Sequence, residues 1–471
     1  MTQPHQRLLE GPIVKSLLAL AVPIALANVL QAAYQLIDAF WVGRLGGDAV
    51  AAVSVSTPVM FLTIGLGAGL AIAGSTLIAQ YFGARNQEMV DHVAAQTLLM
   101  IVIVSVVLGV LGYLFAPVLL RLMGVTEVVY EGALGFMRVS FVGLVFNFFF
   151  FMFQSIMRGV GEVKLPVYIV LGTVILNFIL DPPFIFGWGP IPRMGVMGAA
   201  VATLATQSLA AIVGLVVLLR GSHSVHLMWR DFMPDFAYVK RAFFLGLPAS
   251  VEQSARALGL TVLTFLIATF GTLTMAAYGV GSTILQVVMI PAFGLSMAVS
   301  ALVGQNIGAG QLERATKIAR LGASLGFWIL TAMGAIAFVF APQLIAFFVP
   351  GDPNVIAKGA VYLRTMALSW GFLGAQFSLI GVLRASGNMM TTMVLTLVSQ
   401  WVLQFPLAYV LSKHTGLGDR GIWIAFPISN VLTALITMAV YARGDWKQKR
   451  LVDPAFEPAV TTEILAEEGT R

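Results

Sequence analysis

Long apolar runs alternate with short charged stretches along almost the whole chain. Most runs hold about 20 residues or more without Asp, Glu, Lys or Arg, which is the length of a helix that crosses a bilayer. The residues do not alternate between apolar and polar in segments of about 10, as a transmembrane barrel requires. The pattern therefore predicts twelve helical spans, near residues 16–40, 49–80, 93–115, 133–156, 166–187, 195–219, 241–269, 275–306, 318–340, 360–383, 392–411 and 421–441.

The composition supports a membrane protein and excludes several kinds of chemistry. Hydrophobic residues make up 59% of the chain and charged residues 10%, whereas a soluble domain has about 25% charged residues. The absence of cysteine excludes disulfides, thiolate metal sites and cysteine nucleophiles, and the five scattered histidines predict no metal site. No Gly-x-x-x-x-Gly-Lys-Ser/Thr motif is present, so an ion gradient is the expected energy source. We expect no enzyme activity and no cofactor.

The basic residues indicate the orientation of the chain in the membrane. With twelve spans, eighteen Lys and Arg lie on the side of the termini and six lie on the opposite side. The positive-inside rule then places both termini in the cytoplasm of a multi-pass plasma (inner) membrane protein. The polar segment 1–15 precedes a first span that we expect to be retained, because no signal-peptide cleavage pattern follows it. The net charge of +6 thus reflects topology, and we expect no nucleic-acid partner.

The chain contains an internal repeat. An offset of 225 positions aligns residues 20–85 with residues 245–310 at 16 identities in 66 pairs, and an offset of 226 aligns Arg138 with Arg364. Because each half has an even number of spans, the halves enter the membrane in the same orientation. We predict an all-α membrane protein with twelve transmembrane helices in two six-helix bundles, related by a pseudo-two-fold axis along the membrane normal. The domains are a cytoplasmic N-terminus (1–15), an N-lobe (16–220), a cytoplasmic linker (221–240), a C-lobe (241–441) and a cytoplasmic tail (442–471).

Few ionisable residues lie inside the spans, and each is a functional candidate because charge in a bilayer is costly. Asp38 ends a polar face of the first span that also carries Gln31, Tyr34 and Gln35, at helical spacings of three, four and seven. Pro23 in the same span permits a bend. This arrangement favours an acid whose protonation or cation binding is coupled to the shape of the span. The alternative is an interfacial carboxylate beside Arg44.

The fifth span carries a second candidate. Asn177 and Asp181 are four residues apart and so share a helix face, and Asp181 precedes two prolines that make the helix irregular. A carboxylate, an amide oxygen and loosened carbonyls suit a monovalent cation or a proton relay. The alternative is a turn that ends the helix at the outer surface.

Other charged residues favour structural roles. Glu252 and Arg256 are also four apart, and we expect them to neutralise each other. The repeat-related Arg138 and Arg364, near span ends, are expected to extend toward the membrane surface.

Several motifs resemble those of the multidrug and toxic compound extrusion (MATE) family. They are Pro23 followed by Asp38-Ala-Phe-Trp-Val-Gly-Arg-Leu-Gly46, Ala49-Val-Ala-Ala-Val-Ser54, and Ala79-Gln-Tyr-Phe-Gly-Ala-Arg85 with its echo in the second half. The resemblance covers residues 12–441 and is strongest to the DNA-damage-inducible branch. It implies a V-shaped pair of lobes that exports cationic or amphipathic drug-like compounds in exchange for H⁺ or Na⁺.

The resemblance also implies roles for particular residues. Asp38, Asn177 and Asp181 match the coupling residues of that branch, and Thr203, in preference to Thr206, matches its threonine on the sixth span. Pro23 matches the proline where the first span bends. Implied cavity-lining residues are Gln31, Tyr34, Asn147 and Gln154. Any Na⁺ would bind at the coupling site, and a monomer is expected. A lipid or lipid-linked precursor flippase of the same superfamily and a channel remain as alternatives.

Overall fold

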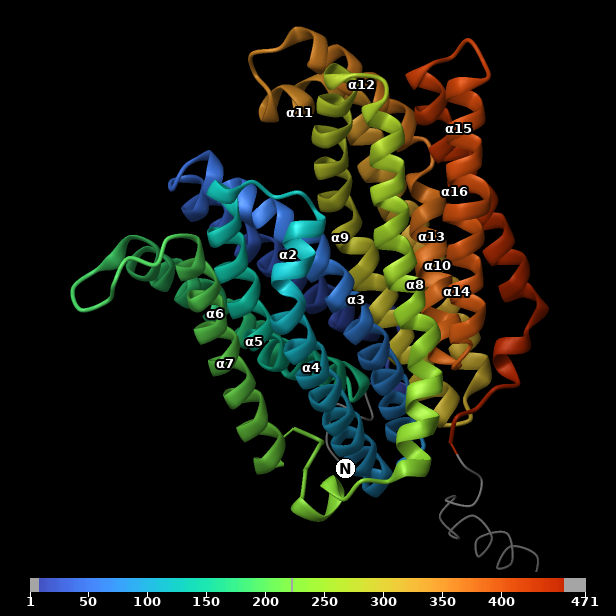
Figure 1. The fold of residues 1–471 in the computed structure, drawn as a ribbon. Helices are drawn as coiled ribbons and strands as arrows, with labels where there is room; N and C mark the ends of the chain where they lie inside the picture. The colour runs from blue at the N-terminus through green and yellow to red at the C-terminus, as the bar shows by residue number, and fades with distance from the viewer. Residues whose placement is uncertain (1–7, 222, 453–471) are drawn as a thin grey trace, which may run out of the picture.

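The computed structural model describes residues 8–221 and 223–452, and these residues form an all-helical protein of two lobes (Figure 1). The lobes contact each other near the end of the molecule where the first long helix begins and the last one ends, close to the two termini of the described chain, and diverge at the opposite end. We call these ends the terminal side and the opposite side. Each lobe has an apolar core of its own, built around Phe153 in the first lobe and around Trp370 in the second.

The N-lobe contains six long helices. Their bounds are α2 (Ile13–Gly43), α3 (Gly47–Gly83), α4 (Gln87–Leu122), α5 (Glu127–Gly159), α6 (Lys164–Pro182) and α7 (Val196–Arg220). Short polar or glycine-containing turns separate them, and left-handed glycines such as Gly161 allow the tight reversals.

The C-lobe repeats this arrangement with more interruptions. Its elements are α8 (Phe236–Ala268), α9 (Thr272–Gly308), α10 (Leu312–Val339), the short α11 (Ala341–Phe348), α12 (Pro353–Ala367), α13 (Trp370–Ala385), α14 (Met389–Leu397), α15 (Phe405–Lys413) and α16 (Asp419–Arg443). A π-helical segment, η3 (Val398–Gln404), joins α14 to α15 as one span. Within the described residues, eleven elements are long and apolar enough to cross a membrane, and the bent pair α12 and α13 makes a twelfth span. The predicted fold class is confirmed.

The tenth span is broken, where the sequence predicts one continuous helix over 360–383. Helices α12 and α13 meet at an angle of 51°. At the break, the hydroxyl of Ser369 donates to the Met366 carbonyl at 3.0 Å and accepts from Asn430 of α16 at 3.1 Å. Side-chain bonds that compete with the helical ladder are a known cause of such bends.

The fifth span passes through its two prolines without ending. Helix α6 runs to Pro182, and a π-helical turn, η1 (Pro183–Gly187), continues it. Proline has no N–H to give to the α-helical ladder, which accounts for the change of helix type. Asp181 therefore lies on helical backbone and is fully buried.

The lobes meet through symmetric backbone contacts on the terminal side. A Cβ atom on Gly83 would overlap the Gln305 carbonyl, and one on the repeat-related Gly308 would overlap the Gln80 carbonyl. Gln80 of the N-lobe donates to the Ala385 carbonyl of the C-lobe at 2.7 Å, and Gln305 of the C-lobe donates to the Gly159 carbonyl at 2.8 Å. Both the donors and the acceptors are repeat-related pairs, so the interface follows the pseudo-two-fold symmetry.

Candidate functional site

A cavity of about 460 Å³ lies inside the N-lobe, between α2, α3, α5 and α7. Its polar lining comes from residues that include Gln31, Tyr34, Gln35, Asp38, Asn147, Thr203 and Gln207. The rest is mostly apolar, with Met60 and Phe61 among the larger side chains. Asp38 is the one Asp, Glu, Lys or Arg among the described residues that line it. A smaller cavity of about 160 Å³ between α3, α5 and α7 shares several lining residues with it, Asn147 and Thr203 among them.

The predicted polar face of the first span points into this cavity, but one expected lining residue does not. Gln154 lies seven residues beyond Asn147 on α5, two turns closer to the terminal side, and is absent from the lining. Pro23 lies within α2, which continues through it as a helix.

Asp38 and Asp181 come from different helices and are joined by Asn177. The Asn177 Nδ2 donates to Asp38 Oδ1 at 2.6 Å and to Asp181 Oδ2 at 2.9 Å. Thr203 Oγ1 of α7 donates to the other Asp38 oxygen at 3.4 Å. The four residues that the sequence selects from three spans thus form one cluster, which we call the acid cluster.

Two oxygens of the acid cluster have no donor. Asn177 Oδ1 and Asp181 Oδ1 are buried, and no described residue donates a hydrogen bond to either. Unpartnered buried oxygens carry a free-energy cost, and two neighbouring carboxylates in a membrane interior cannot both keep their charge cheaply. A proton or a small cation would remove both costs. The cluster therefore offers oxygen atoms that could bind such an ion.

Thr206, the less favoured alternative to Thr203 under the family resemblance, contacts a residue that lines the cavity. The Tyr34 hydroxyl and the Thr206 hydroxyl are 2.6 Å apart, and Tyr34 is 3% exposed. Thr206 lies three residues after Thr203, on the same side of α7. That spacing is the signal in the sequence that could have identified it.

The C-lobe has no acid cluster at the corresponding place. The repeat aligns Asp38 with Leu263 and Asp181 with Leu407; Leu263 is buried in the apolar core of the second lobe, and the partly buried Leu407 packs against it. The pseudo-symmetry of the backbone is therefore not matched by the side chains at the candidate site.

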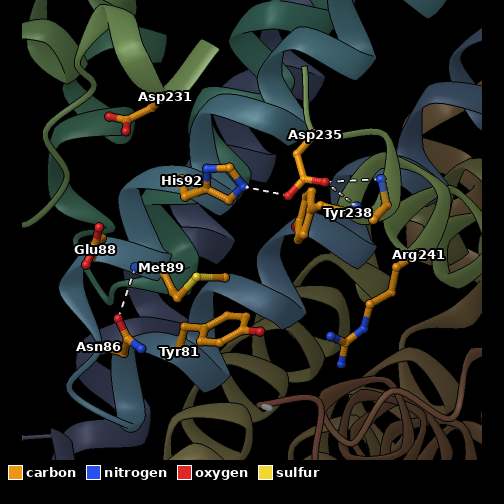
Figure 2. Close-up of a pocket in the computed structure, with 10 residues that line it drawn as sticks. Tyr81, Asn86, Glu88, Met89, His92, Asp231, Asp235, Tyr238 and Arg241 are labelled. Atoms are coloured by element: carbon orange, nitrogen blue, oxygen red, sulfur yellow. Dashed lines mark hydrogen bonds and ion pairs between the residues drawn. The ribbon is translucent and has the colours of Figure 1, made fainter. Parts of the chain in front are cut away.

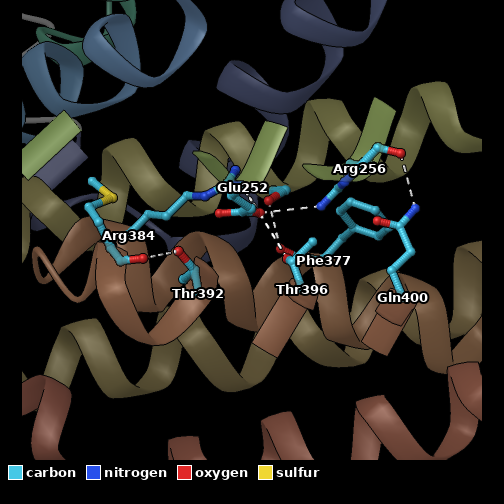
Figure 3. A network of polar contacts seen from close by, with 9 residues as sticks. Glu252, Arg256, Phe377, Arg384, Thr392, Thr396 and Gln400 are labelled. Carbon is cyan, nitrogen blue, oxygen red and sulfur yellow. Dashed lines mark hydrogen bonds and ion pairs between the residues drawn. The ribbon is translucent and has the colours of Figure 1, made fainter. Parts of the chain in front are cut away.

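Glu252 of the C-lobe belongs to a different network (Figure 3). Its Oε1 accepts from Arg384 at 2.7 Å, from Thr396 at 3.1 Å and from Arg256 at 3.3 Å, and the residue is fully buried. The expected contact between Glu252 and Arg256 is present, but the shorter ion pair is with Arg384, which the sequence places only in a turn. Two guanidinium groups around one carboxylate make an ion-paired network that holds α8, α13 and α14 together.

A second cavity, of about 450 Å³, lies on the terminal side where the segment between the lobes joins α8 (Figure 2). Asp235 caps α8 by accepting from the backbone N–H groups of Ala237 and Tyr238, and it lies 3.3 Å from His92 of α4. The backbone N–H of Tyr238, together with His92, holds the pKa of Asp235 below its ordinary value. These contacts fix the start of the C-lobe to the N-lobe.

Comparison with known proteins places this architecture in a family. The MatE family model matches residues 23–182 and again residues 248–410, and the two matches begin at the repeat-related Pro23 and Pro248. A probable multidrug resistance protein of Bacillus subtilis, YoeA, is 30% identical over 95% of this chain and 97% of its own length. A FAD transporter of Shewanella oneidensis is 27% identical over 91% of this chain and 94% of its own.

The solved structures agree with the sequence comparison. A MATE family multidrug resistance transporter of the MOP superfamily, in an outward-facing conformation, superposes with a TM-score of 0.88 at 27% identity. The match covers 95% of this chain and 99% of the solved one. The chain, with its two family matches and its twelve spans in two lobes, is a member of the MATE family of membrane transporters.

Proposed function

We propose that the protein is a secondary active antiporter that exports cationic or amphipathic small molecules in exchange for H⁺ or Na⁺. Its relatives include proteins named for multidrug resistance, and its site combines a drug-sized cavity with an adjoining cluster that can bind an ion. A volume of about 460 Å³ falls within the usual range for small-molecule sites. No cofactor takes part, and the coupling ion is itself transported.

The observation that carries this proposal is the position of Asp38. Its side chain lines the cavity and also accepts hydrogen bonds from Asn177 and Thr203 in the acid cluster. One carboxylate therefore faces both the substrate space and the ion site. A cationic substrate favours the ionised acid, whereas protonation or cation binding removes the attraction. Occupancy of the two sites is then mutually exclusive, which obligatory exchange requires.

The arrangement of the lobes supports alternating access. The lobes touch on the terminal side through Gln80, Gln305 and the glycines beside them, and diverge on the opposite side. If the terminal side faces the cytoplasm, lobes that diverge on the opposite side form an outward-open state. Separation of the symmetric contacts would open the cavity to the cytoplasm, in the manner of two rocking bundles.

The acid cluster favours coupling through the N-lobe, as in the DNA-damage-inducible branch. Asn177, Asp181 and Thr203 complete that cluster, whereas Glu252 is held by two arginines. A single chain contains both lobes and the whole cavity, which fits a monomer.

The cavity lining argues against a carrier of lipid-linked anions. Among the described residues that line it, no Lys or Arg is present and Asp38 supplies negative charge. A flippase for phosphate-bearing precursors would need cationic groups in this position.

Gradient-driven transport into proteoliposomes tests the proposal. An imposed proton or sodium gradient should drive accumulation of a fluorescent organic cation such as ethidium, and Asp38→Asn should abolish the accumulation. Undiminished transport by Asp38→Asn, or accumulation that needs no gradient, would contradict it. Uptake of an anionic lipid probe in place of ethidium would support the flippase instead.

A further inference from the structure

Two repeat-related arginines, Arg138 of α5 and Arg364 of α12, differ in the hydrogen-bond acceptors of their guanidinium groups. Arg364 donates its Nε to the Phe338 carbonyl at 3.1 Å. The Arg138 Nε is buried and has no acceptor among the described residues, and Arg138 forms no ion pair with any of them. Its guanidinium lies 4.9 Å from the ring centre of Tyr113. Among the residues that the structure describes, Arg138 is therefore a cation inside a membrane span without a counter-charge.

A groove of about 450 Å³ surrounds this guanidinium, between α4, α5 and α7. Its walls are mainly apolar, with Leu134, Val142, Met197 and Leu204 among them. Val142 is 52% exposed and Tyr113 is 40% exposed, so the groove opens away from the protein interior. An exposed, mainly apolar surface on membrane-spanning helices faces lipid.

The depth of Arg138 matches the boundary between hydrocarbon and headgroups. Helix α5 has 33 residues and begins on the opposite side at Glu127, so Arg138 lies roughly 16 Å from that end at 1.5 Å per residue. Helical side chains lean toward the helix N-terminus, which carries the guanidinium further toward the membrane surface. The midpoint of α5 is near Gly143, so the Arg138 Cα lies roughly 8 Å from the middle of the helix at 1.5 Å per residue. A long side chain that leans outward from there brings the guanidinium to the edge of the hydrocarbon core, about 15 Å from the midplane, where the headgroups begin.

A carboxylate lies at the mouth of the same groove. Glu131 lines it on the same face of α5, seven residues before Arg138, or roughly 10 Å further out along the helix axis. Glu131 forms no ion pair among the described residues. The groove thus presents a cation near the phosphate level and an anion beyond it. Their sum is neutral, which favours a zwitterion over an anion.

We propose that this groove binds a phospholipid with an ethanolamine headgroup from the leaflet on the opposite side. The phosphodiester pairs with Arg138, the primary ammonium pairs with Glu131, and an acyl chain lies along the apolar walls. Such a lipid supplies the counter-charge that no described residue gives to Arg138. Tyr113 restrains the guanidinium on its other side by the cation–π contact.

The test measures lipid-specific stabilisation of the delipidated, full-length protein. Thermal unfolding is followed with added phosphatidylethanolamine, phosphatidylglycerol or phosphatidylcholine, and bound lipids are counted by native mass spectrometry. Phosphatidylethanolamine should stabilise the wild type most, and Arg138→Gln should weaken its apparent affinity about tenfold or more. The matched control is Arg364→Gln. Because the Arg364 Nε already donates to a carbonyl of the protein, this variant should keep the wild-type affinity.

Two further variants separate the parts of the proposal. Arg138→Lys should retain much of the lipid affinity, which excludes a general folding defect. Glu131→Gln should shift the preference toward phosphatidylglycerol, because the groove becomes net positive. Equal stabilisation of wild type and Arg138→Gln by all three lipids would overturn the proposal. Equal protection by millimolar inorganic phosphate would also overturn it, because the site would then bind free phosphate.

Discussion

Asn177 of α6 donates its side-chain amide to Asp38 of α2 at 2.6 Å, across 139 positions of sequence. The second hydrogen of the same amide points to Asp181, at 2.9 Å. One neutral group therefore holds two acids from different helices in one buried cluster. Any change in the protonation or cation occupancy of the pair must alter the contact between α2 and α6.

Removal of this amide should uncouple transport while leaving substrate binding intact. Asn177→Leu has a similar volume but no donor, and Asn177 does not line the cavity. Because hydrogen bonds to charged groups contribute about 1.5–3 kcal/mol, gradient-driven transport should fall about tenfold or more. Equilibrium binding of ethidium should change little. The matched control is Thr173→Val, one turn away, whose hydroxyl bonds to the Val170 carbonyl of its own helix and to no other described residue. Equal losses in both variants would contradict this role.

Substitutions of Thr203 and Thr206 should change different transport parameters. Thr203 contacts Asp38, so Thr203→Val should lower the apparent affinity for the coupling ion. Thr206 contacts Tyr34, so Thr206→Val should mainly raise the apparent KM for substrate. A neutral hydrogen bond contributes about 1 kcal/mol, so each effect should be roughly fivefold. Transport measured against ion concentration and against substrate concentration distinguishes them, and identical effects on both parameters would contradict the assignment.

The symmetric glutamines should stabilise the contact between lobes. Gln80→Ala and Gln305→Ala each remove a hydrogen bond across the interface, which should increase opening on the terminal side roughly fivefold. The chain has no cysteine, so Ser250→Cys provides a single reporter at the interface, where Ser250 packs on Gly69. Maleimide labelling of that cysteine should accelerate in both glutamine variants.

The control for this measurement is Gln376→Ala. Gln376 is a buried glutamine on α13 with no hydrogen bond across the lobes among the described residues. The Ser250→Cys reporter should be labelled at the same rate with and without Gln376→Ala. If Gln376→Ala accelerates labelling as much as the other two variants do, the effect reflects general loosening of the protein.

Glu252 should prove important for stability. Glu252→Gln leaves Arg384 and Arg256 without their counter-charge, and breaking a buried pair in this way costs about 3–5 kcal/mol. The double variant Glu252→Gln/Arg384→Gln removes one of the stranded charges and should recover part of the lost stability. Thermal unfolding in detergent checks both. A Glu252→Gln protein as stable as the wild type would contradict the structural role.

Much of the fold follows from the sequence, because long apolar runs and a constant repeat offset define spans and halves directly. Within one helix, spacing rules also identify pairs such as Asn177 and Asp181. Those rules say nothing about contacts between helices. The bond from Asn177 to Asp38 and the ion pair from Arg384 to Glu252, 132 positions apart, depend on how helices pack.

Local breaks are equally difficult to predict. The bend between α12 and α13 occurs at Ser369, whose partner Asn430 lies on α16. Neither residue is a strong helix breaker in the sequence. That the Arg138 Nε has no acceptor among the described residues is likewise visible only when the surrounding side chains are placed.

The most direct test of the central claim is ion release on substrate binding. Purified protein in weakly buffered solution, with a pH indicator and a sodium electrode, is mixed with ethidium. If the acid cluster couples the two fluxes, the wild type and a stable Glu252 variant such as Glu252→Gln/Arg384→Gln should release the ion. Asp181→Asn should bind ethidium without releasing the ion. Asp38→Asn should keep its fold and likewise release no ion. Release that persists in both aspartate variants but disappears in the Glu252 variant would contradict coupling through the N-lobe.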